Sequence, residues 1–171
     1  MHSQQGIGMV EVMVALLLLA NAVLGFSFLQ MRAVDASTEA MSKLQATNLA
    51  RDLSERIRAN AQAYTVYLQA VNLDQASQQA KNCVQTNTET PCSTAQQLAL
   101  FDVSEIKQLA QRQGMQIRMP LCHTSGNQSA RNCIYVAWGE TQAIDDDSSK
   151  LACTRNGSYL PRAQCVVMEL Y

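Results

Sequence analysis

Six cysteines are the residues of this 171-residue chain whose type and spacing most clearly indicate chemistry. An even number of cysteines in a small domain is typical of a disulfide framework, which forms in an oxidising compartment. Six cysteines can pair in many ways, but the sequence groups them as three close couples and so favours sequential pairing. The favoured pairs are Cys83 with Cys92, Cys122 with Cys133, and Cys153 with Cys165.

Metal binding and catalysis are the other kinds of chemistry to weigh. A zinc site is disfavoured because the chain has no Cys-x-x-Cys pair and His123 is the only histidine near the cysteines. The acidic run Asp145, Asp146 and Asp147 is a candidate for calcium, but it lacks the spaced ligands of a dedicated loop, so we expect a solvated turn. No phosphate-binding glycine loop or catalytic constellation stands out, and we expect no enzyme activity, no cofactor and no metal.

Charge and hydropathy are distributed unevenly along the chain. The formal net charge is −1 and 16% of the residues are charged, against about 25% in an ordinary soluble domain. A net charge this close to zero, without a basic stripe in the sequence, gives nucleic acid no surface to bind, so we expect no nucleic-acid partner. The stretch 7–29 is almost wholly apolar, with Glu11 as its one charge. As a helix it would measure roughly 35 Å, which is enough to cross the hydrocarbon core of a membrane.

Three interpretations compete for this segment. It could be an uncleaved signal anchor, or a secretory signal cleaved after Ala22, since Ala20-Asn21-Ala22 has the small-x-small form. The secretory signal is disfavoured because the apolar run continues beyond that site and its start carries no basic residue. The third interpretation depends on Gly6-Ile7-Gly8-Met9-Val10-Glu11, in which a glutamate lies five residues after a glycine and opens an apolar helix.

This hexapeptide resembles the prepilin signature of type IV pilins and type II secretion pseudopilins. The resemblance implies a leader peptide at 1–6, cleavage between Gly6 and Ile7 by prepilin peptidase, and N-methylation of Ile7. A glutamate inside a membrane helix is costly and needs a partner. Cleavage would create an amine at Ile7, and Glu11 could pair with the amine of a neighbouring subunit inside a filament.

The remaining pattern predicts an α+β roll, in which a long N-terminal helix packs on a small antiparallel sheet. We expect the helix over 7–71, with its transmembrane part at 7–29, and a disulfide-bonded head over 72–171. Apolar residues at spacings of three and four predict the buried face of the helix; they are Leu49, Leu53, Ile57, Ala61, Tyr64, Leu68 and Val71. The opposite side is expected to be solvated; it carries Arg51, Asp52, Glu55, Arg56 and Arg58.

In the head, the sequence pattern predicts a helix followed by strands. Ser93 and Gln96 take capping-box positions, and Asp102 and Glu105 repeat them, which favours two short helices or one kinked helix ending before Gly114. Alternating apolar residues predict strands at 115–121, 133–138 and 165–171. Asn156-Gly157 predicts a tight turn.

Further segments are similar to minor pilins of the PilV type: the stretches 24–30 and 92–99, and a last strand that begins Cys165-Val-Val-Met. This resemblance implies a structural subunit that helps to prime assembly of the type IV pilus or sits near its tip. It implies a single pass through the inner membrane with a periplasmic head, then a place in the filament at the cell surface. The implied partners are other minor and major pilins and prepilin peptidase. The alternatives are a type II secretion minor pseudopilin and a signal-anchored or secreted periplasmic binding module or hydrolase.

Overall fold

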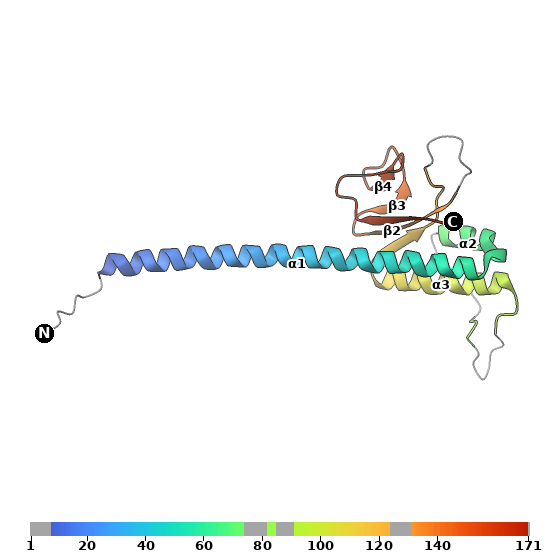
Figure 1. The fold of residues 1–171 in the computed structure, drawn as a ribbon, viewed down its shortest axis with the longest axis horizontal. Coiled ribbons are helices and arrows are strands. Elements are labelled where there is room, and N and C mark those ends of the chain that lie inside the picture. Colours follow the sequence, from blue (N-terminus) through green and yellow to red (C-terminus); the bar gives the residue numbers. More distant parts are fainter. Residues whose placement is uncertain (1–7, 74–81, 85–90, 124–130, 171) are drawn as a thin grey trace. The chain divides into compact units, whose positions relative to one another are not determined.

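The computed structural model describes residues 8–73, 82–84, 91–123 and 131–170 (Figure 1). The chain divides into two compact units, Met1–Met41 and Ser42–Tyr171. Helices and strands follow in the order α1 (Met9–Ala59), a 3-10 turn (Ala61–Ala63), α2 (Tyr64–Asn72), α3 (Ala95–Arg112), β1 (Met115–Arg118), β2 (Cys133–Trp138), β3 (Gln142–Asp145), β4 (Ala152–Arg155), β5 (Ser158–Tyr159) and β6 (Cys165–Glu169).

The first unit consists, where it is described, of the N-terminal part of α1. Its sequence is rich in leucine and alanine and contains no proline, so nothing interrupts the helical hydrogen bonds. Two polar side chains in this part bond to the backbone of the preceding turn: the Asn21 amide donates to the Leu17 carbonyl, and the Ser27 hydroxyl donates to the Val23 carbonyl. The unit is therefore a helix whose internal hydrogen bonds need no other element.

In the second unit, helices cover one face of an antiparallel sheet with strand order β1-β2-β6. The part of α1 after residue 42 lies beside α3 (Figure 1), and α2 packs on α3 and on β1. Their apolar side chains form one core with alternate residues of the strands. Its most completely buried members include Leu53, Tyr67, Ile106, Met119 and Ile134. The fold is thus the expected α+β arrangement of a long helix packed on a small sheet.

The second face of β2 is buried as well, beneath a second sheet with strand order β3-β4-β5. Tyr135 and Ala137 pack there against Ala143 and two cystines. In this sheet β3 pairs with β4 in parallel and β4 pairs with β5 in antiparallel register. The expectation of a single small sheet was incomplete, because these strands are only two to four residues long and show no sustained alternation.

Three disulfides link elements of the head, and they join the neighbouring couples of the sequence: Cys83–Cys92, Cys122–Cys133 and Cys153–Cys165. The second closes the connection between β1 and β2. The third joins β4 to β6, and therefore ties the two sheets together. Short strands bury little apolar surface, so cross-links of this kind supply stability that the small core alone does not.

The long helix differs from the expectation of one helix over 7–71, because α1 ends at Ala59. Asn60 leaves the helical conformation, with φ −126° and ψ 48°, and its amide donates to the carbonyl of Ala95 at 2.8 Å. Asparagine commonly exchanges helical geometry for such a local side-chain contact. The interruption shifts the register, so that Ala63 of the 3-10 turn and Tyr67 of α2 are buried, whereas Ala61 is exposed and Leu68 is half-buried.

The helix expected after Cys92 is one continuous helix, α3, whose N-cap is Thr94 rather than Ser93. The Thr94 hydroxyl accepts a hydrogen bond from the backbone N–H of Gln97, and the Gln97 side chain accepts one from the backbone of Ser93. Thr94 and Gln97 therefore cap the helix one residue later than expected, and the Gln97 side chain bonds to the residue before the N-cap. Asp102 and Glu105 cap no second helix; both bind Arg56 of α1. The helix ends before Gly114, whose φ is +68°.

The three expected strands are present as β1, β2 and β6, with β1 ending three residues earlier than predicted. The turn predicted at Asn156-Gly157 joins β4 to β5, and both residues have positive φ, 49° and 75°. A two-residue hairpin loop of this type needs positive φ at both positions, which Asn and Gly adopt at low cost.

Candidate functional site

The last three residues of the N-terminal signature, Met9 to Glu11, lie at the start of α1. Gly6 and Ile7 fall outside the described residues. Glu11 is in the first turn of α1, where its backbone N–H donates to the carbonyl of Gly8 at 3.0 Å. A carboxylate at this place interacts favourably with the helix dipole. Among the described residues, none donates a hydrogen bond to the Glu11 side chain or forms an ion pair with it.

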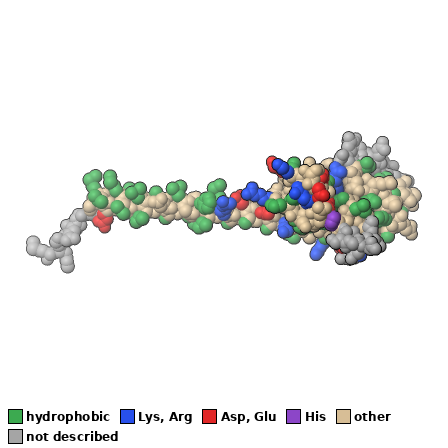
Figure 2. Space-filling view, turned by 90° about the horizontal axis from the view of Figure 1, so that it is seen from above, with side chains coloured by type: hydrophobic (Ala, Val, Ile, Leu, Met, Phe, Trp, Pro, Cys, Tyr) green, Lys and Arg blue, Asp and Glu red, His purple; other side chains and the backbone are tan. Residues whose placement is uncertain are grey.

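The surface that follows Glu11 is apolar on all sides. Every described residue before residue 42 is exposed, and sixteen large apolar side chains between residues 9 and 34 expose about half or more of their area (Figure 2). By length and composition α1 is able to cross a membrane, with a mean hydropathy of 2.4 in its most apolar window. A single apolar stripe would indicate packing on one domain, whereas exposure all round indicates lipid or a bundle of other helices as the surroundings.

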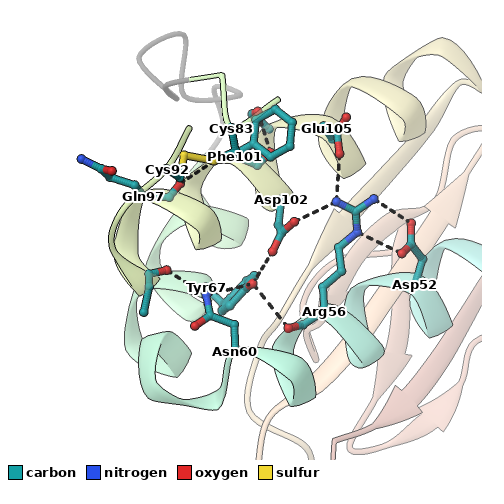
Figure 3. A network of polar contacts seen from close by, with 12 residues as sticks. Asp52, Arg56, Asn60, Tyr67, Cys83, Cys92, Gln97, Phe101, Asp102 and Glu105 are labelled. Atoms are coloured by element: carbon teal, nitrogen blue, oxygen red, sulfur yellow. Dashed lines mark hydrogen bonds and ion pairs between the residues drawn. A yellow bond between two sulfur atoms is a disulfide. The ribbon is translucent and has the colours of Figure 1, made fainter. Parts of the chain in front are cut away.

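In the second unit, a group of polar side chains is centred on Arg56 (Figure 3). Its guanidinium binds Asp52 of the same helix at 2.9 Å, and Asp102 and Glu105 of α3 at 2.8 and 2.9 Å. The Tyr67 hydroxyl of α2 donates to the second oxygen of Asp102 at 2.5 Å. The network therefore connects α1, α2 and α3 through one buried carboxylate.

The protonation of this network follows from its burial and its partners. Burial raises the pKa of Tyr67 above its ordinary value, and the bond to Asp102 raises it further. Burial alone would lower the pKa of Arg56, but its hydrogen bonds to Asp52, Glu105 and Asp102 outweigh this effect and raise it. A neutral phenol and a charged guanidinium that are held this firmly are suited to fixing the packing of three helices rather than to proton transfer.

The sequence pattern did not indicate this network, because Arg56 lies on a helix face predicted to be solvated and Asp102 lies at a predicted capping position. A signal for Asp102 was present, since it lies at helical spacing from Ala99 and Ile106, which are both buried. Lys107 shares this face: it is buried, and its ammonium donates to the carbonyls of Ala70 and Leu73. These bonds satisfy carbonyl groups at the C-terminus of α2, where a cation also interacts favourably with the helix dipole.

In the acidic run that was weighed as a calcium candidate, two of the three carboxylates accept hydrogen bonds within the chain. The Asp145 carboxylate accepts a hydrogen bond from the backbone of Gly157 at 3.3 Å, and the Asp146 carboxylate accepts two from Ser148 at 2.7 Å. These bonds from Ser148 lower the pKa of Asp146. In the part of the chain that the structure describes, no group of three or more His, Cys, Asp or Glu side chains could hold a metal ion.

Part of the chain matches the model of a known protein family. Residues 28–104, a little under half of the chain, match the family model described as "Tt1218-like: Type IV pilin Tt1218". This supports a type IV pilin family for the chain. Comparisons with curated proteins and with solved structures give no match.

The match to type IV pilins and the N-terminal signature are independent, because the signature at 6–11 lies outside the matched residues. The matched stretch begins within the apolar part of α1 and ends in α3, two residues after Asp102. It therefore contains Arg56, Tyr67 and Asp102, and it covers the packing of α1 and α2 on the first half of α3. Pilins are structural proteins, which agrees with the exposed apolar helix.

The Arg56 network predicts a large and specific loss of stability when its centre is removed. Arg56→Met leaves Asp102 buried with Tyr67 as its remaining partner, so we expect the free energy of unfolding to fall by about 2 kcal/mol. Arg51→Met is the matched control, since Arg51 is an exposed arginine on the same helix, and its effect should stay within about 0.5 kcal/mol. Urea denaturation of the oxidised protein measures both, and equal effects would contradict the role of the network.

The raised pKa of Tyr67 predicts that stability depends on alkaline pH. An unfolded tyrosine ionises near pH 10, whereas the folded protein holds the Tyr67 phenol neutral, so the folded state binds more protons above that pH. The contribution of Tyr67 to the free energy of unfolding is therefore fully present below about pH 10 and is lost as the pH rises further. In Tyr67→Phe the fall should be shallower. Denaturation series between about pH 8 and about pH 11 test this, and identical slopes would show that Tyr67 does not contribute.

Proposed function

We propose that this chain is a minor pilin of the PilV type, a structural, non-enzymatic subunit of the type IV pilus. The observation that carries the proposal is the all-round exposure of the apolar part of α1 in a chain whose remaining residues bury an ordinary core. The family match over 28–104 and the prepilin signature at 6–11 support it. We place the subunit in the complex that primes pilus assembly, near the tip of the filament.

In this proposal the apolar helix lies first in the membrane and later in a filament. The span 7–29 first anchors it in the inner membrane, with the head on the periplasmic side, where the three disulfides can form. Prepilin peptidase removes 1–6, and the new amine of Ile7 is methylated. The apolar helix then moves from lipid into a bundle formed by the helices of other minor and major pilins.

Glu11 aligns the subunit during this transfer. Its carboxylate lies at the start of an apolar surface on which the described part of the chain offers it no partner, so a charge buried there is costly until a cation is found. The N-terminal amine of a neighbouring pilin is such a cation. Pairing with it defines one position along the neighbouring helix, which the apolar side chains around Glu11 cannot define by themselves.

Processing is tested by the mature N-terminus of protein recovered from the cell envelope in which it is made. Mass spectrometry should find a chain that begins with N-methylated Ile7. A strain without prepilin peptidase is the control and should retain Met1. A chain that begins at Val23, or an unprocessed chain in the presence of the peptidase, would contradict the pilin mechanism.

The assembly role of Glu11 is tested by Glu11→Val. The substitution removes the buried charge and raises the hydropathy of the segment, so membrane insertion should be retained while recovery of the protein in sheared pili falls at least tenfold. Glu39→Val is the matched control, because Glu39 is an exposed glutamate of the same helix beyond the apolar span. Normal recovery of Glu11→Val in pili would contradict the proposed pairing, and recovery with a secretion complex instead of pili would indicate a pseudopilin.

A further inference from the structure

The loop between β4 and β5 contains Asn156-Gly157, the only asparagine–glycine pair in the sequence. Asparagine is a chemically labile residue. It is most labile before glycine, because no Cβ atom shields the backbone nitrogen that follows its side chain. That nitrogen can attack the carbon of the side-chain amide, which is the first step of deamidation. Asn156 and Gly157 are both exposed, so water has access to the pair.

The fold leaves little freedom to replace either residue. Asn156 has φ 49° and Gly157 has φ 75°, and asparagine and glycine adopt such a conformation at lower cost than other residues. A Cβ atom added to Gly157 would also lie 3.1 Å from the Cβ atom of His123, which is closer than an ordinary contact. The tight turn therefore keeps a labile dipeptide at an exposed position.

A carboxylate lies next to the nitrogen that would attack. The two side-chain oxygens of Asp145 accept the backbone N–H of Gly157, at N···O distances of 3.3 and 3.5 Å. Both distances exceed the usual value of about 2.9 Å, so the carboxylate restrains this nitrogen weakly and still remains within reach of its proton. Asp145 is thus placed to take up the proton that the nitrogen loses when it bonds to carbon.

We propose that Asn156 is a site of self-catalysed deamidation in which Asp145 acts as the base. The Gly157 nitrogen forms a bond to Cγ of Asn156 and passes its proton to the Asp145 carboxylate. The bond between Cγ and the side-chain nitrogen then breaks, and that nitrogen leaves as ammonia with the proton returned by Asp145. Water hydrolyses the resulting cyclic succinimide to aspartate or isoaspartate. The reaction needs water as its co-reactant and requires neither a membrane nor a pilus.

The product changes the loop and the strand that follows it. Isoaspartate adds a carbon atom to the backbone of a tight two-residue loop, and either product adds a negative charge close to Asp145. β5 consists of Ser158 and Tyr159 alone, so it has few bonds of its own to hold it. The Tyr159 hydroxyl accepts the backbone N–H of Val167, in the edge strand β6, at 3.1 Å. Modification of Asn156 therefore loosens β5 and uncovers the Val167 amide.

The site is tested by ageing the oxidised full-length protein in neutral, detergent-containing buffer. Trypsin cleaves after Arg155 and Arg162 and isolates Asn156 in a short peptide, in which mass spectrometry with chromatography separates asparagine, aspartate and isoaspartate. Isoaspartate should accumulate there. Asp145→Asn should slow the conversion about tenfold, less than the roughly hundredfold of a well-aligned enzyme base, because the contact is long. Asp147→Asn, the same change at an exposed carboxylate of the same acidic run, should leave the rate unchanged.

A second comparison needs no substitution and is decisive even where Asp145→Asn fails to fold. The wild-type chain unfolded in urea keeps Asn156-Gly157 but loses the contact with Asp145, so the folded protein should convert at least as fast as the unfolded chain. Slower conversion of the folded protein would overturn the proposal, and so would equal rates for folded wild type and folded Asp145→Asn. Either result would leave the proposed pilin function intact, because the reaction involves residues of the second unit alone.

The effect on β5 is measured by hydrogen exchange. In aged wild-type protein the Val167 amide should exchange faster, in proportion to the isoaspartate formed. Asn156→Gly is the matched control, because a glycine pair also fits a two-residue hairpin loop and has no side-chain amide to react. Its Val167 exchange should not change with ageing. Unchanged exchange at Val167 in fully converted wild-type protein would overturn the loosening of β5.

Discussion

The apolar surface between residues 9 and 34 is the constraint on which the behaviour of this protein depends. Covering sixteen large apolar side chains is favourable by about 1.5–3 kcal/mol each, on the order of 20–50 kcal/mol together. A folded domain is stable by about 5–15 kcal/mol in all. The free energy gained by covering this surface therefore exceeds the whole stability of a typical small domain. The chain needs another apolar phase for its N-terminal helix, while its head folds without using that surface.

The second unit must fold with a small core of its own. Its core is formed by short strands, three helices and three disulfides, and the C-terminal part of α1 belongs to it through Leu49, Leu53 and Ile57. The Arg56 network adds directional bonds between α1 and α3 that apolar contacts do not supply. Because Tyr67 joins the same carboxylate, α2 is held in the same arrangement. The end of α1 is thus fixed within the head by both packing and polar geometry.

Much of this fold was predictable from the sequence, and the differences have identifiable causes. The strand at 133–138 and the end of α3 before Gly114 follow from periodicity and from the conformational needs of glycine. The interruption at Asn60 depends on a bond to Ala95, far away in sequence, that no local pattern contains. The second sheet is made of strands too short to show a period. Of the candidate site, the exposed apolar helix was predictable from composition, whereas the partners of Arg56 required the relative placement of α1 and α3.

The polar groups of the apolar helix determine whether lipid or protein is the better surrounding for it. Lipid chains and leucine-rich helices cover apolar side chains about equally well, so hydrophobicity alone gives no reason to leave the membrane. Arg32 lies over the ring of Phe28 at 5.3 Å, and Ser27 is bonded within its own helix. The carboxylate of Glu11 and the remaining amide groups of Asn21 have no such partner among the described residues. Lipid chains cannot satisfy them and a neighbouring helix can, so in the function proposed above these groups, together with close packing, would favour a bundle of helices over the bilayer.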